Sequence, residues 1–128
     1  MARMNTANAL FDLLWLRVIS DGGWKVVLDL SDKPPYRGET IFQPVQKIIV
    51  SVRKHRPGES LEATLLHEMI HAVFDISDRV PQHEKREESR VRDLEKFMMR
   101  AISKDRKSKL RGVLKRAEKV YEDHTGKT

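Results

Sequence analysis

One short segment, residues 64–74, limits the possible folds of this chain more than any other. At 100° per residue, a helix over this segment places His67, Glu68 and His71 on one arc with Thr64. The opposite arc, continued to position 76, is apolar and consists of Leu65, Leu66, Met69, Ile70, Val73 and Ile76. Such a helix must bury its apolar arc against other elements while holding two imidazoles and a carboxylate together on the polar arc.

The spacing of the two histidines indicates metal binding. Side chains four residues apart share a helix face, so His67 and His71 can bind one metal ion, while Glu68 points at the water beside it. The chain has no cysteine, so imidazole and carboxylate groups must hold any transition metal. This segment is similar to the H-E-x-x-H signature of zinc peptidases.

The segments before this helix are predicted from periodicity and from breaking residues. Apolar residues recur at helical spacing over residues 6–20, and residues 21–23, Asp-Gly-Gly, are a typical helix stop. Three runs of strand character follow, at residues 24–30, 37–42 and 46–52. We therefore expect one helix and then a small three-stranded sheet.

The rest of the chain is predicted to be helical. Ser60 is the expected N-cap of the helix with the two histidines, which ends within residues 75–81. A second helix begins near Glu84 and is followed by a break at residues 103–108. A basic amphipathic helix over about residues 107–122 completes the pattern.

These elements predict one α+β domain over residues 1–128, with its core at about residues 24–102. No apolar run approaches the roughly 20 residues that cross a bilayer, so we expect no membrane contact. The absence of cysteine suits a reducing compartment, and we expect a cytoplasmic protein.

Positive charge is concentrated at the C-terminal end. The formal net charge is +6; residues 1–84 contribute −1 and residues 85–128 contribute +7. A basic end of this kind can contact nucleic acid or an acidic partner, although basic helix faces are commonly only solvated.

A catalytic zinc ion usually has three protein ligands and a water, so the two histidines need a third. Phe74 occupies the glycine position of the H-E-x-x-H-x-x-G-x-x-H pattern, and the position of its third histidine is Ser77, which excludes the metzincin arrangement. The remaining option is a carboxylate at the start of the next helix, where Glu84, Glu87 and Glu88 stand.

Three segments together resemble a known group. Gly38-Glu39-Thr40 precedes a strand ending in Ile48-Ile49-Val50, the signature lies in residues 62–72, and residues 88–94 match a pattern similar to E-x-x-V-x-x-L. Over about residues 24–100 the chain resembles the small zincin-like metallopeptidases encoded by phages and prophages. These are minimal gluzincins, distant relatives of thermolysin.

The resemblance implies a zincin-like fold and a Zn²⁺ ion held by His67, His71 and Glu88, with Glu68 as the catalytic base. Helical projection disagrees slightly, because Glu87 lies nearer the centre of the apolar face of its helix. Glu88 is therefore the preferred third ligand and Glu87 the alternative.

Other groups are needed around such a site. Gluzincins generally use a His or Tyr to stabilise the oxyanion, and the candidates are Tyr36, His55 and His83. Asp75 and Asp93 can reach the second ring nitrogen of a ligating histidine. Spacing alone assigns none of these residues.

The implied function is zinc-dependent hydrolysis of peptide bonds in a protein or peptide substrate by a zinc-activated water. The resemblance also suggests that the substrate backbone pairs with residues 46–52, if that strand forms the sheet edge. The alternative is a non-catalytic module of the same fold whose basic C-terminal helices bind nucleic acid or a protein partner.

Overall fold

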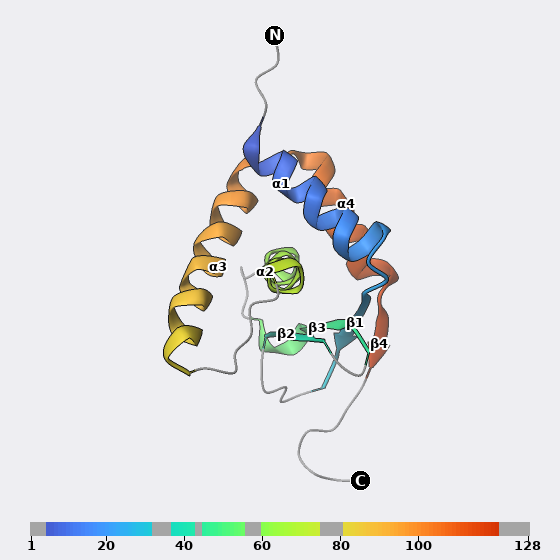
Figure 1. Cartoon of the computed structure of the whole chain (residues 1–128). Helices are drawn as coiled ribbons and strands as arrows, with labels where there is room; N and C mark the ends of the chain where they lie inside the picture. Colours follow the sequence, from blue (N-terminus) through green and yellow to red (C-terminus); the bar gives the residue numbers. More distant parts are fainter. Residues whose placement is uncertain (1–4, 32–36, 43–44, 56–59, 75–80, 121–128) are drawn as a thin grey trace.

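The computed structural model describes residues 5–31, 37–42, 45–55, 60–74 and 81–120; for residues 81–87 it describes the backbone only. Within this part of the chain, four α-helices and a four-stranded mixed sheet form an α+β fold (Figure 1). The predicted fold class is confirmed at this level, with one strand more than expected.

The sheet has the strand order β2-β3-β1-β4. Its strands are β1 (Lys25–Asp29), β2 (Gly38–Ile41), β3 (Lys47–Ser51) and β4 (Glu118–Val120). Strand β1 runs parallel to β3 and β4, whereas β2 is antiparallel to β3. The three predicted strands are therefore confirmed, but β3 lies inside the sheet, and the expectation that it forms an edge is wrong. The edge on that side is β2.

Strand β4 replaces the end of a predicted helix. Helix α4 (Lys104–Arg116) stops at Ala117, whose backbone is extended at φ −65° and ψ 145°. The chain then pairs with the free side of β1: the Leu30 amide donates to the Val120 carbonyl at 2.8 Å, and Lys25 forms an exposed ion pair with Glu118. The predicted helix over residues 107–122 is thus wrong in its last part, because an open edge of β1 offers these backbone groups partners.

The first helix ends where the sequence indicated. Helix α1 (Thr6–Trp15) continues into a π-helical turn, Leu16–Ser20. Gly23 then adopts φ +64°, and a Cβ at Gly22 would lie within bonding distance of the Arg17 carbonyl oxygen. Both glycines are therefore required for the chain to turn into β1.

The C-terminal helices meet in a short corner. Helix α3 (Pro81–Ala101) is followed almost at once by α4, so the predicted break at 103–108 is shorter than expected. Ser103 caps α4 by accepting from the Arg106 amide, and its own amide donates to Asn8 of α1 at 2.9 Å. A local cap and a contact from α1 together fix this corner.

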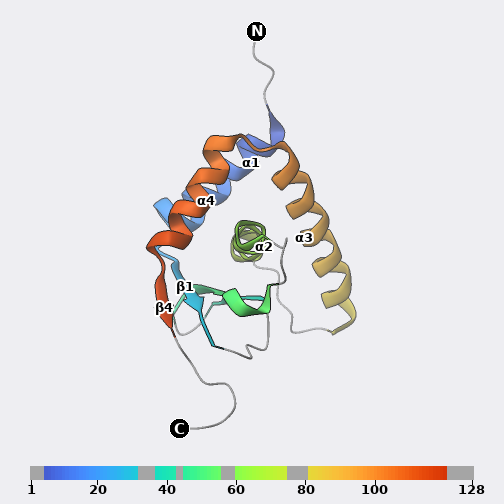
Figure 2. The same ribbon diagram turned by 180° about the vertical axis from the view of Figure 1, so that it is seen from behind.

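The central element is α2 (Leu61–Phe74), the helix with the two histidines. Ser60 caps it, as predicted, by accepting from the Ala63 amide. Seen along its axis, α2 lies between the sheet and the other three helices (Figures 1 and 2). Every residue from Leu65 to His71 is buried. The polar arc of this helix therefore faces protein, and its charged groups must find partners inside the fold.

None of the helices described is long and apolar enough to cross a membrane.

Candidate metal centre

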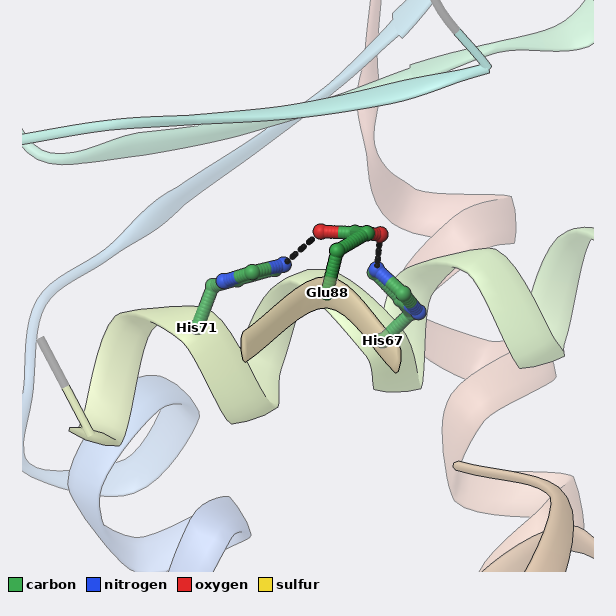
Figure 3. A group of neighbouring side chains, drawn as sticks. All are labelled: His67, His71 and Glu88. Atoms are coloured by element: carbon green, nitrogen blue, oxygen red, sulfur yellow. Dashed lines mark hydrogen bonds and ion pairs between the residues drawn. The ribbon is translucent and has the colours of Figure 1, made fainter. Parts of the chain in front are cut away.

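Three of the predicted site residues meet between α2 and α3. His67 and His71 project from successive turns of α2, and the Glu88 carboxylate of α3 lies between their imidazoles (Figure 3). One carboxylate oxygen lies 2.6 Å from His67 Nε2 and the other lies 3.0 Å from His71 Nε2. The two imidazoles and the carboxylate therefore converge on one point through these atoms.

This cluster fits the requirements of a zinc ion. One ligand atom from each of His67, His71 and Glu88 lies within 4.8 Å of the others. Zinc–ligand bonds of about 2.1 Å in a tetrahedral site place ligand atoms about 3.4 Å apart, so modest shifts of the three side chains would let them hold one ion. Two neutral imidazoles and a carboxylate are a typical ligand set for catalytic zinc. Glu84 and Glu87, the alternatives, have side chains outside the described residues.

A fourth residue, Glu95, completes the surroundings of His67. Its carboxylate lies 3.1 Å from His67 Nδ1, the ring nitrogen that does not face Glu88. A carboxylate on the far nitrogen fixes the orientation of a ligating imidazole and increases its basicity. Sequence reasoning proposed Asp75 and Asp93 for this role; Asp93 is exposed and Asp75 lies outside the described residues. The available signal was that Glu95 follows Glu88 by seven residues, two helical turns along the same face.

The charges of the cluster are strongly coupled. Burial lowers the pKa of His67, but hydrogen bonds to Glu88 and Glu95 and the charges of Glu88 and Glu68 outweigh it and raise the pKa to about 9. Hydrogen bonds from His67 and His71 hold the pKa of Glu88 well below its usual range. In the metal-free protein, protonated His67 thus balances the negative charge of the neighbouring carboxylates. A bound metal ion would balance that charge instead.

Glu68 lies beside this cluster under the edge strand. It is only 8% exposed, and the Thr40 hydroxyl of β2 donates to its carboxylate at 2.8 Å. Burial raises the pKa of Glu68, opposed by the Thr40 hydrogen bond and by the charges of His67 and His71. Gly38 is on the same face of β2, and a Cβ there would lie 3.1 Å from a Glu68 carboxylate oxygen. Residues 38 and 40 thus hold the Glu68 carboxylate in place from the sheet side.

The oxyanion candidates are placed as follows. His55 bonds through Nδ1 to the Ser51 carbonyl at 2.8 Å and through Nε2 to the Thr64 hydroxyl at 2.6 Å. A carbonyl only accepts, so Nδ1 of His55 carries the hydrogen. Both ring nitrogens of His55 therefore form hydrogen bonds that connect β3 to α2, which argues against His55 as the residue that stabilises the oxyanion. Tyr36 and the side chain of His83 lie outside the described residues.

No family model, curated protein or solved structure matches this chain in the comparisons made. The function must therefore be argued from the site.

Proposed function

We propose that this protein is a zinc metallopeptidase of the gluzincin type, with His67, His71 and Glu88 as metal ligands and Glu68 as general base. The observation that carries the proposal is the convergence of two imidazoles and a carboxylate within 4.8 Å beside a buried carboxylate that is not one of the three. When bound there, zinc supplies Lewis acidity and lowers the pKa of its water toward about 7.

The protein's own residues have distinct tasks in this reaction. Glu68 accepts the proton of the attacking water and delivers it to the leaving amine. Its burial suits this role, because a carboxyl with a raised pKa can both take and return a proton nearer neutral pH. Thr40 orients the Glu68 carboxylate, and Glu95 orients the His67 ring. Both contacts reduce the reorganisation needed during the reaction.

The substrate in this proposal is an extended segment of a peptide or protein. Strand β2 is an edge of the sheet, and Thr40 and Gly38 on it adjoin Glu68. A peptide that adds to the outer side of β2 would pair its backbone with this strand and bring a carbonyl close to the general base. We assign this activity to the cytoplasm, since the chain has no cysteine to protect or pair.

The experiment compares the parent with Glu68→Gln, both loaded with zinc, on a library of peptides analysed by mass spectrometry. The substitution keeps the size of the side chain and removes its basicity. We expect both proteins to bind one equivalent of zinc and only the parent to cleave. Equal cleavage by Glu68→Gln would refute the assigned mechanism. Zinc binding without cleavage by either protein would favour the non-catalytic module.

A further inference from the structure

The net positive charge of the molecule resides in one short segment. Residues 104–119, which form α4 and most of β4, carry eight basic and two acidic side chains. The remaining residues carry seventeen of each kind. The whole net charge of +6 therefore belongs to this segment, and the rest of the chain is balanced.

Four of the seven basic residues of α4 lie along one side of the helix, whereas Arg106, Lys109 and Arg116 project from other sides. Lys104, Lys107, Arg111 and Lys115 recur at helical spacing and form a stripe about 16 Å long, from the rise of 1.5 Å per residue. Lys104, Arg111 and Lys115 are exposed, and Lys107 is half-buried. Leu110, Val113 and Leu114 are buried and lie about 110° round the helix from the stripe, next to Lys107. This packing fixes which side faces out, and α4 lies on the outside of the molecule (Figure 2).

Few acidic groups neutralise this stripe within the described residues. Asp105, the one acidic residue of α4, lies about 100° round the helix from Lys104. Glu62 of α2 contacts Arg111 at 3.6 Å, a partly exposed pair that contributes little. Asp12 is bound by Arg106, which is not part of the stripe. The field at this surface is therefore positive over the length of the helix.

We propose that this basic stripe binds the phosphate backbone of nucleic acid. A duplex carries one negative charge per roughly 1.7 Å of axis, so a stripe of this length spans about ten phosphate charges. An anionic membrane is a poorer fit, because the exposed large apolar side chains of the described residues are Leu13, Leu16, Val45, Phe74 and Phe97, none of them on α4. The proposal is independent of the peptidase activity.

The test is fluorescence anisotropy with a labelled DNA duplex of about 20 base pairs and an RNA single strand of similar length, between about 50 and 200 mM salt. The triple variant Lys104→Gln, Lys107→Gln, Lys115→Gln removes three cations of the stripe. We expect affinity for the duplex to fall at least about thirtyfold at the lowest salt, and the slope of log K against log salt to lose up to about 2.7, at 0.9 per phosphate contact.

The matched control removes three exposed cations from α3: Arg92→Gln, Lys96→Gln, Arg100→Gln. Both triple variants have the same net charge, so the control should retain affinity within about threefold if the stripe is the binding surface. Glu68→Gln should bind like the parent, which separates this result from the peptidase test. Equal losses in the two triple variants would overturn the proposal. So would no measurable binding by the parent, or tighter binding to anionic lipid vesicles or polyglutamate than to nucleic acid.

Discussion

Gly38→Ala tests how closely β2 approaches α2 above the site. A Cβ at position 38 would lie 2.7 Å from Thr64 Cγ2 and 3.0 Å from Glu68 Cγ. The backbone of Gly38 is not left-handed, so the cost comes from these contacts and not from φ. Overpacking costs about 1–3 kcal/mol, and loss of glycine from a strand returns about 0.5–1 kcal/mol. We expect a net destabilisation of about 1–2 kcal/mol.

Urea unfolding of the metal-free protein, followed by tryptophan fluorescence in the presence of a chelator, measures this effect. With a urea dependence of about 2 kcal/mol per molar, the midpoint should fall by about 0.5–1 M. The matched control is Thr64→Ser, which removes the methyl group nearest to the added Cβ and keeps the hydroxyl that bonds His55.

The double variant Gly38→Ala, Thr64→Ser should regain part of the loss, because the shortest contact no longer exists. Purely additive effects of the two substitutions would show that Cβ of residue 38 does not meet Thr64. A single variant Gly38→Ala as stable as the parent would refute the close packing of β2 on α2.

Two further predictions concern His67. Its pKa is raised from 6.5 to about 9 in the metal-free fold, so its stabilising contribution is complete below about pH 6.5 and is lost as the pH rises through 9. The free energy of unfolding, measured with chelator present, should therefore fall by up to about 3 kcal/mol between those pH limits. A free energy that does not change with pH, or one that falls equally in His67→Gln, would contradict this. Glu95→Ala should weaken zinc binding about 10- to 100-fold in a chelator competition. Glu95→Gln can still accept a hydrogen bond from His67 Nδ1, so its zinc affinity should fall less. Unchanged zinc affinity in Glu95→Ala would show that Glu95 does not support the site.

The parts of the molecule that follow from local pattern were predictable from the sequence. The helix over residues 61–74, its Ser60 cap and three strands each depend on periodicity or on a capping residue within a few positions. The shared face of His67 and His71 is likewise a property of helix geometry alone.

Features that depend on packing between distant segments were missed. Strand β4 has three residues, too few for a period-two pattern, and it forms because β1 has a free edge about ninety residues earlier. Which face of α3 meets α2 depends on how the two helices pack, so the seven-residue spacing indicates Glu95 only after Glu88 is known to face His67. The edge position of β2 similarly follows from the order of the strands in space.

The central claim is that His67, His71 and Glu88 form one zinc site. Metal analysis of the purified protein after dialysis against zinc, beside its Glu88→Ala and Glu87→Ala variants, tests this most directly. The account predicts one equivalent of zinc in the parent and in Glu87→Ala, and its loss in Glu88→Ala, where only two ligands remain. Zinc retained by Glu88→Ala and lost by Glu87→Ala, or no zinc in the parent, would contradict it.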